Sequence, residues 1–273
     1  MTTSHPDDEN TPRWASYVAI GDSFTEGLWD PYPNDPDRQR GWADLLAGHL
    51  STRRSAAGQA PLEYANLAIR GRLLRSILTE QVPAAIALKP DLVSLIGGGN
   101  DILRPGADVD ALLRSMEEAV AGLRAAGVDV LMGTGFDPAG SPVIQRTRPK
   151  VGVYNAGLWS IAHRHGAYVL DTWGMRSLRD MRMWAEDRIH LSTAGHERAA
   201  QAALVGLGLA PDDDAWDDPL VPLPPAARAD RWRGNVRWAR AYALPWVRRR
   251  LHRRSSGDLR QAKYPGPVVV EPR

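Results

Sequence analysis

The chain has 273 residues, of which 43% are hydrophobic, and it carries a formal net charge of +2 and no cysteine. This length and apolar content are enough to build one sizeable core, which excludes a disordered chain and a disulfide-stapled mini-protein. The absence of cysteine excludes thiol nucleophiles, thiolate metal sites and disulfides, so any covalent chemistry must use another nucleophile.

The N-terminal segment does not read as a targeting sequence. The first ten residues, MTTSHPDDEN, carry acids where a signal peptide needs a basic flank and an apolar stretch. No apolar run approaches the roughly 20 residues that a membrane span needs. We therefore expect a cytoplasmic protein in which residues 1–14 form an N-terminal tail.

Short apolar runs alternate with segments of helical periodicity along residues 15–210. The apolar runs are typical of buried strands, and they cover residues 17–20, 66–69, 91–96, 128–132 and 167–171. Helical patterns lie at about residues 41–50, 72–82, 109–123, 153–165 and 193–207. This alternation predicts an α/β domain with a mainly parallel sheet, and in such sheets ligands gather beyond the carboxyl ends of the strands.

The composition changes after about residue 210, and residues 211–273 are expected to form a proline-rich linker and a basic C-terminal extension. Residues 228–254 contain ten arginines and one acid, with Trp232, Val236 and Trp246 at helical spacing. A basic amphipathic helix of this kind fits an anionic membrane surface or nucleic-acid phosphates. The alternative, which we favour, is a helix that packs its tryptophans on the main domain and leaves its arginines in solvent.

Ser23 is the first candidate for chemistry. The first predicted strand runs into Gly21-Asp22-Ser23, which places Ser23 at the carboxyl edge of the sheet, where a nucleophile is useful. Ser23 and Glu26 also spell a capping box, in which the two side chains satisfy free N–H groups at a helix start. From these residues alone both interpretations stay open.

A second candidate segment precedes the last helix of the domain. A serine hydroxyl is a poor nucleophile until a neutral imidazole removes its proton, and a carboxylate can fix the tautomer of that imidazole. Asp187 and His190 supply both groups from one loop. An Asp-x-x-His pair is often structural, however, and Ser192 or Thr193 nearby fits a helix cap.

Two further segments contain candidate hydrogen-bond donors. Asn100 follows three glycines after the predicted strand 91–96, and its amide N–H is suited to an oxygen that becomes negative during acyl transfer. Gly71 follows the predicted strand 66–69, and its backbone N–H is a second such donor. The alternative is a pair of tight turns, in which glycine and asparagine are common.

In this order the four segments resemble the SGNH (GDSL) hydrolase family, also described as GDSL-like lipases and acylhydrolases, over about residues 15–207. The resemblance implies that Ser23 is the nucleophile, that Ser23, Gly71 and Asn100 form the oxyanion hole, and that Asp187 and His190 supply the base. It also implies a three-layer α/β/α sandwich with a five-stranded parallel sheet and a flavodoxin-like architecture.

The activity implied by the resemblance is that of a serine esterase, or acylhydrolase, which cleaves a carboxylic ester through an acyl-enzyme on Ser23 without a cofactor. Carboxylic esters, thioesters, phospholipids and sugar acetates all stay open as substrates, as does acyl transfer to an alcohol other than water. The rival hypothesis is a membrane-surface or nucleic-acid-binding protein that acts through its basic extension and carries an inactive hydrolase-like domain. We expect a small-molecule or lipid ester as the partner, rather than nucleic acid.

The residues around the candidate site permit two interpretations each. Trp29, Tyr32, Trp42 and the segment Phe136–Pro138 either line a substrate pocket or belong to the core and its covering loops. Arg70 and Arg72 flank Gly71, and we interpret them as solvated surface arginines rather than as a site for an anionic leaving group. His163 and His165 are not expected to bind a metal, because side chains two residues apart on a helix point to different faces.

Overall fold

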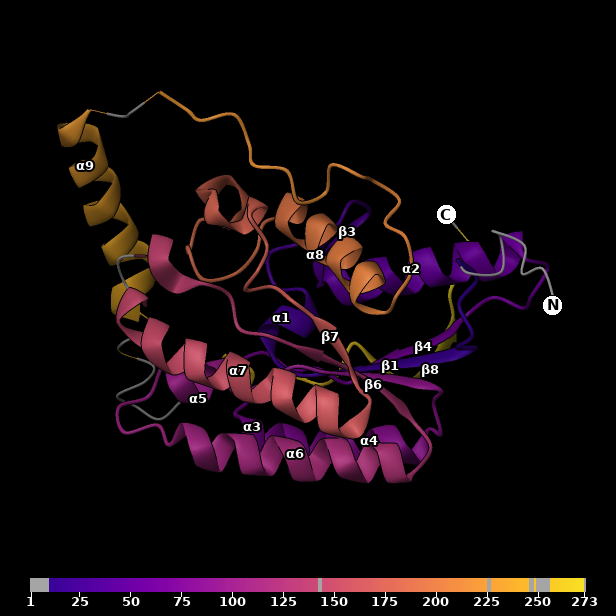
Figure 1. Cartoon of the computed structure of the whole chain (residues 1–273). Helices are drawn as coiled ribbons and strands as arrows, with labels where there is room; N and C mark the ends of the chain where they lie inside the picture. Colours follow the sequence, from indigo (N-terminus) through magenta and orange to yellow (C-terminus); the bar gives the residue numbers. More distant parts are fainter. Residues whose placement is uncertain (1–9, 142–143, 225–226, 246–247, 249–255, 273) are drawn as a thin grey trace.

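The computed structural model of the chain describes residues 10–141, 144–224, 227–245, 248 and 256–272. Its centre is a six-stranded sheet with the strand order β7-β6-β5-β1-β4-β8 (Figure 1). The five strands from β7 to β4 in this order are parallel to one another, and β8 pairs antiparallel with β4 at one edge of the sheet. The strands are β1 (Ser16–Ile20), β4 (Glu63–Asn66), β5 (Leu92–Leu95), β6 (Asp129–Gly133), β7 (Tyr168–Leu170) and β8 (Tyr264–Val269).

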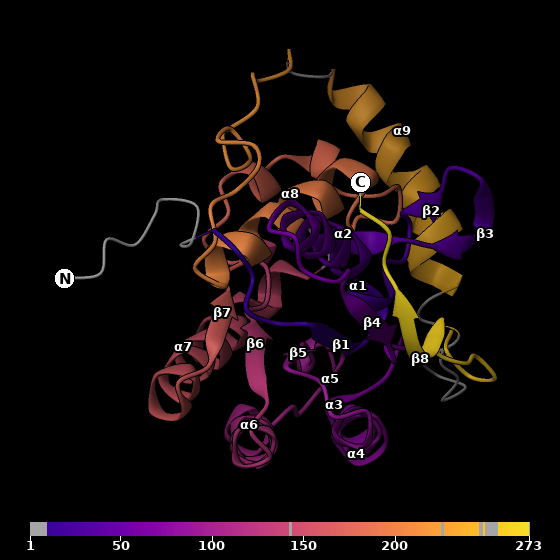
Figure 2. The ribbon, with the colours of Figure 1, turned by 90° about the vertical axis from the view of Figure 1, so that its right-hand side faces the viewer.

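Helices cover both faces of the sheet (Figures 1 and 2). One face is covered by α2 (Gly41–Ala56) and α8 (Thr193–Gly206), and the other by α4 (Val82–Ala87), α6 (Val109–Ala125) and α7 (Arg148–His165). Three short helices follow strands at the carboxyl side of the sheet: α1 (Ser23–Glu26), α3 (Leu74–Ser76) and α5 (Gly99–Ile102). A hairpin of β2 (Pro31–Tyr32) and β3 (Asp35–Gln39) precedes α2.

The alternation of side chains along β1 explains why the sheet has a core on each side. Successive side chains of a strand point to opposite faces. Tyr17 and Ala19 pack with α2 and α8, whereas Val18 and Ile20 pack with α4, α6 and α7. All four residues are buried, so β1 is buried on both faces from Tyr17 to Ile20, as expected of a central parallel strand.

The strands expected near residues 17–20, 91–96, 128–132 and 167–171 are all present. The strand expected at residues 66–69 ends at Asn66 instead, and Leu67 to Ile69 run on as a loop that hydrogen-bonds to Ala19 and Gly21, with Leu67 and Ala68 buried. The sheet has six strands in the described residues, not the expected five. The additional strand, β8, contains Pro265 and Pro267, which cannot donate ladder hydrogen bonds and are tolerated because β8 is an edge strand.

The C-terminal extension returns to the domain twice. After α8 the chain crosses the molecule to α9 (Arg228–Trp238), which continues into a π-helical turn (Ala239–Ala243), and β8 then joins the sheet (Figure 1). Residues beyond 210 thus contribute a strand to the domain expected over residues 15–210.

The helix of the extension packs on the domain through some of its aromatic residues. Trp238 contacts the domain, but Trp232 is 68% exposed, and Trp246 lies outside the described residues. Binding of the arginine-rich face to an anionic surface stays a prediction. In the part of the chain that the structure describes, no helix is both long and apolar enough to cross a membrane.

Candidate active site

Ser23 is the first residue of α1, which Gly21 and Asp22 connect to the end of β1. The N-cap of this helix is Asp22, whose carboxylate accepts the N–H of Phe24. The capping-box interpretation of Ser23 and Glu26 is therefore wrong, because Asp22 already caps the helix and the Glu26 carboxylate instead binds the backbone N–H and guanidinium of Arg70. The Ser23 hydroxyl is left available for another partner.

That partner is His190, which lies on a loop 167 residues further along the chain. The Ser23 Oγ lies 2.9 Å from His190 Nε2, and His190 Nδ1 lies 2.5 Å from Asp187 Oδ2. The three side chains form one continuous hydrogen-bonded chain, with the imidazole between a hydroxyl and a carboxylate. The arrangement allows the imidazole to receive the hydroxyl proton while the carboxylate fixes its tautomer.

The Asp187 carboxylate is buried and accepts four hydrogen bonds. Its Oδ1 accepts the backbone N–H groups of Ile189 and His190, and its Oδ2 accepts the ring N–H of His190 and the indole N–H of Trp29. Burial by itself would raise the pKa of Asp187, but the hydrogen bonds and the charge of His190 outweigh burial and lower it. Asp187 is therefore an ionised acceptor at neutral pH.

Asn100 and Gly71 approach the same end of the sheet. Asn100 lies on α5, and its amide nitrogen donates to Asp22 Oδ2 at 3.0 Å and to the carbonyl of Arg72 at 3.1 Å. Gly71 adopts φ +74°, a left-handed conformation that glycine reaches without steric cost. Asp22 thus links Asn100 to the helix that carries Ser23, and Asn100 in turn holds the turn that contains Gly71.

Asp22 is a buried carboxylate between the nucleophile helix and Asn100. Burial raises its pKa from 3.8 to about 6, although the N–H of Phe24, the charge of His190 and the amide of Asn100 act in the opposite direction. Keeping this side chain ionised at neutral pH therefore costs folding free energy.

The aromatic residues near the site divide between the core and the active-site loop. Trp42 is fully buried and stacks on Phe24 at 5.4 Å, so it belongs to the core. Phe136 packs edge-on against Phe24, and the Tyr32 hydroxyl donates to Asp44. Trp29 is 37% exposed and donates to Asp187, a role that the sequence did not indicate because 158 residues separate the two.

Other interpretations of polar residues near the site are settled by their contacts. Arg70 is not a solvated surface arginine, because its side chain is only 12% exposed and is paired with Glu26. Arg72 pairs with Glu80 at 3.2 Å. Ser192 does cap α8, since its hydroxyl accepts the N–H of Gly195.

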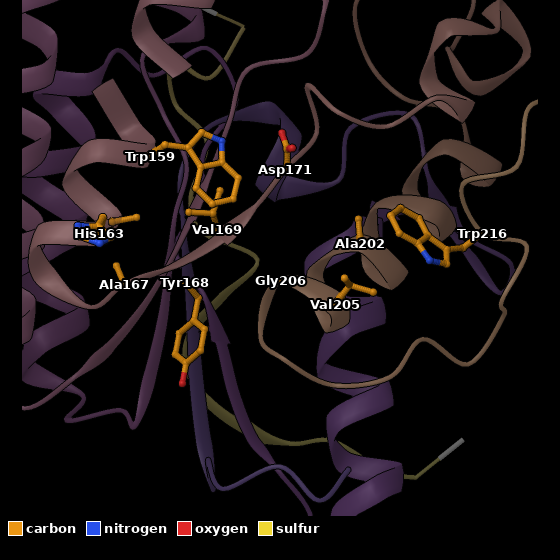
Figure 3. A pocket seen from close by; sticks show the side chains of 11 residues that line it. Trp159, His163, Ala167, Tyr168, Val169, Asp171, Ala202, Val205, Gly206 and Trp216 are labelled. Atoms are coloured by element: carbon orange, nitrogen blue, oxygen red, sulfur yellow. The ribbon is translucent and has the colours of Figure 1, made fainter. Parts of the chain in front are cut away.

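A cavity of about 460 Å³ lies along the edge strand β7, between α7 and α8 (Figure 3). Its walls include Trp159 and His163 from α7, Val205 from α8, and Trp216 from the chain that follows α8. None of Ser23, Asp187 or His190 lines this cavity, so it is not the site described above. Within the described residues no group of three or more His, Asp or Glu side chains is arranged to hold a metal ion.

Together, the parallel sheet and the Ser-His-Asp arrangement at its carboxyl edge are typical of a serine hydrolase that acts on esters. A model of the GDSL-like lipase/acylhydrolase family matches residues 19–198. The chain therefore belongs to the GDSL-like lipase/acylhydrolase family, and it is a carboxylic ester hydrolase.

Solved structures share this fold. The chain is similar to LAE5, an α/β hydrolase enzyme from the metagenome of Lake Arreo, with 25% identity and a TM-score of 0.61 over 71% of this chain and 95% of that one. It also resembles a single-residue variant of Axe2, an acetyl xylan esterase from Geobacillus stearothermophilus. The identity is 21% and the TM-score 0.62, over 76% of this chain and 100% of the Axe2 chain. The structure of TesA is similar as well, with 23% identity and a TM-score of 0.55 over 70% of this chain and 97% of TesA. A comparison with curated protein sequences gives no match.

Proposed function

We propose that the protein is a serine esterase that cleaves a carboxylic ester through an acyl-enzyme on Ser23. The observation that carries this proposal is the unbroken hydrogen-bonded chain from Ser23 Oγ through the His190 ring to Asp187. A serine that is hydrogen-bonded to an imidazole, with a carboxylate on the far ring nitrogen, is the arrangement that activates a hydroxyl for attack on a carbonyl.

The first half of the reaction acylates the enzyme. Ser23 Oγ forms a bond to the ester carbonyl carbon while His190 Nε2 takes the hydroxyl proton, and the carbonyl oxygen becomes an oxyanion. The tetrahedral intermediate then breaks its bond to the alcohol oxygen, which takes the proton from His190 and leaves as a neutral alcohol. Asp187 holds the ring in the tautomer with the proton on Nδ1 and stabilises the imidazolium that forms between these steps.

The second half returns the free enzyme. His190 takes a proton from a water molecule, and the water oxygen attacks the acyl carbon. When the bond between that carbon and Ser23 Oγ breaks, Oγ recovers the proton from His190 and the carboxylic acid is released.

The oxyanion is bound by the N–H groups of Ser23 and Gly71 and by the Asn100 amide. Ser23 is the first residue of α1, where backbone N–H groups have no acceptor within the helix. Both amide hydrogens of Asn100 already have acceptors, Asp22 and the Arg72 carbonyl. We infer that the oxyanion shares one of these hydrogens when it forms.

The test compares the protein with Ser23→Ala, using p-nitrophenyl esters of short and long chain and a fluorophosphonate probe read by intact mass. We expect one adduct and ester turnover in the wild type and neither in Ser23→Ala. Ser160→Ala is the control, because Ser160 is an exposed serine on α7, and it should behave as the wild type does. Turnover or labelling of Ser23→Ala at the wild-type rate would contradict the mechanism, and an unreactive but folded wild type would favour a binding protein.

A further inference from the structure

The C-terminal extension packs a helix against the loop that carries Asp187 and His190. Figure 1 shows α9 at the end of the molecule where α5 lies, which is the carboxyl side of the sheet. Asn235, Trp238 and Tyr242, on α9 and the π-helical turn that follows it, are three and four residues apart, a spacing that places side chains on one helix face. This face is the one that meets the loop.

Each of three consecutive loop residues is hydrogen-bonded to one residue of α9 or of the π-helical turn that follows it. The pairs are Tyr242 OH donating to Glu186 Oε2 at 2.7 Å, Trp238 Nε1 donating to the backbone carbonyl of Asp187 at 3.0 Å, and Arg188 Nη1 donating to Asn235 Oδ1 at 2.7 Å. The loop runs antiparallel to the helix, so loop and helix meet in a fixed register. A shift of either by one residue would break all three contacts.

A second connection reaches the Asp187 carboxylate itself. The Trp29 indole N–H donates to Asp187 Oδ2 at 3.0 Å, and the Trp29 ring packs edge-on against Tyr242 with centroids 6.0 Å apart. The helix therefore contacts Asp187 directly at its backbone and indirectly at its carboxylate, through Trp29.

Two neighbours of Asp187, one in sequence and one in space, have an uncommon backbone conformation. Arg188 has φ +59° and Trp29 has φ +75°, both in the left-handed region that is unfavourable for residues with a Cβ. Such residues persist only where their surroundings fix them. Arg188 is fixed by Asn235 and by the ring of Trp238, 5.2 Å from its guanidinium carbon, and Trp29 is fixed by Asp187 and Tyr242.

We infer that Asn235, Trp238 and Tyr242 are positioning residues of the active site, which hold the 186–188 loop so that the Asp187 carboxylate stays in line with His190 Nδ1. The inference rests on the proposed function. These residues lie beyond residues 19–198, the part of the chain that matches the family, so this protein adds a support to the site from its own C-terminal extension.

The experiment uses the full-length Trp238→Phe and Tyr242→Phe variants, each of which keeps an aromatic side chain and removes one hydrogen-bond donor. We expect kcat for a p-nitrophenyl ester to fall by about 10- to 100-fold in Trp238→Phe with little change in KM, because a misplacement of about 1 Å in a reacting group can cost about 100-fold. The rate of fluorophosphonate labelling of Ser23 should fall in parallel. Tyr242→Phe should show a smaller loss, because it frees a side chain of the loop rather than its backbone.

Trp232→Phe is the matched control, since Trp232 lies on the same helix and is 68% exposed. Equal kcat and labelling rates in Trp238→Phe and Trp232→Phe would overturn the inference. It would also be overturned if Trp238→Phe lowered the midpoint of urea unfolding without lowering kcat. Proton NMR of the His190 Nδ1–H, which its hydrogen bond to Asp187 shifts downfield, provides a readout that needs no turnover. If the wild type neither turns over esters nor reacts with the probe, the proposed function fails, and loss of this signal in Trp238→Phe alone would still support the inference.

Discussion

Replacing Asp22 with asparagine should stabilise the protein at neutral pH and at the same time impair it as an enzyme. The rise in the Asp22 pKa from 3.8 to about 6 means that ionising this buried group costs about 3 kcal/mol, at about 1.4 kcal/mol for each pH unit. The substitution removes that cost. An amide has one acceptor oxygen, however, whereas the carboxylate accepts from Phe24 on one oxygen and from Asn100 on the other.

Asp22→Asn must therefore lose one of these two hydrogen bonds, which offsets the gain by about 1 kcal/mol. The net gain above pH 6 is then about 2 kcal/mol. Because a raised carboxyl pKa destabilises the folded state only where the unfolded group is ionised, the gain shrinks as the pH falls through 6 and is gone below about 4. Below that pH the variant is the less stable of the two proteins, by the lost hydrogen bond.

The lost hydrogen bond should also reduce activity. If Asn100 turns its amide oxygen toward the new NH₂ group, the oxyanion loses a donor, and removing one such donor costs about 100- to 1000-fold in turnover. Urea unfolding at pH 8 and pH 4, together with ester turnover at pH 8, tests both effects. Asp108→Asn is the control, because Asp108 is also a helix N-cap but lies outside the site, and asparagine caps as well as aspartate. A stability difference that does not vary with pH would refute the electrostatic reasoning, and unchanged turnover would refute the role of Asp22 in holding Asn100.

Two further predictions concern buried groups other than the candidate catalytic residues. Lys263→Met should destabilise the protein by about 3–5 kcal/mol in urea unfolding, because it leaves the buried Asp44 carboxylate without its cation, and a loss below 1 kcal/mol would show that the pair contributes little. Burial lowers the pKa of His196 from 6.5 to about 4, so the unfolded chain takes up a proton that the folded ring does not, and stability should fall on acidification by up to about 1.4 kcal/mol for each pH unit between those values. Relative to the wild type, His196→Gln should lose this slope, and parallel stability curves for the two proteins would contradict the assignment.

The sequence by itself determined the alternation of strands and helices and the five residues of the candidate site. Apolar runs and helical periodicity report which side chains are buried, and burial is what fixes the elements of a parallel α/β sheet. Ser23, Asp187 and His190 were recognisable as candidates because their segments, taken in chain order with those of Gly71 and Asn100, resemble the segments of the SGNH hydrolase family. The apolar pattern misplaced the strand before Gly71, since the loop from Leu67 to Ile69 is as apolar as a strand and its first two residues are as buried.

Only the tertiary structure decided which residues support that site. The contacts of Trp29, Trp238 and Tyr242 with the catalytic loop join segments 51 to 158 residues apart, and no local pattern encodes a partner at that distance. In the helical stripe that the sequence predicts for the extension, Trp232 is 68% exposed. The hydrogen bonds to the loop come instead from Asn235, Trp238 and Tyr242. The partners of these residues lie on a loop at the carboxyl side of the sheet, and the contacts depend on the three-dimensional register of helix and loop rather than on periodicity.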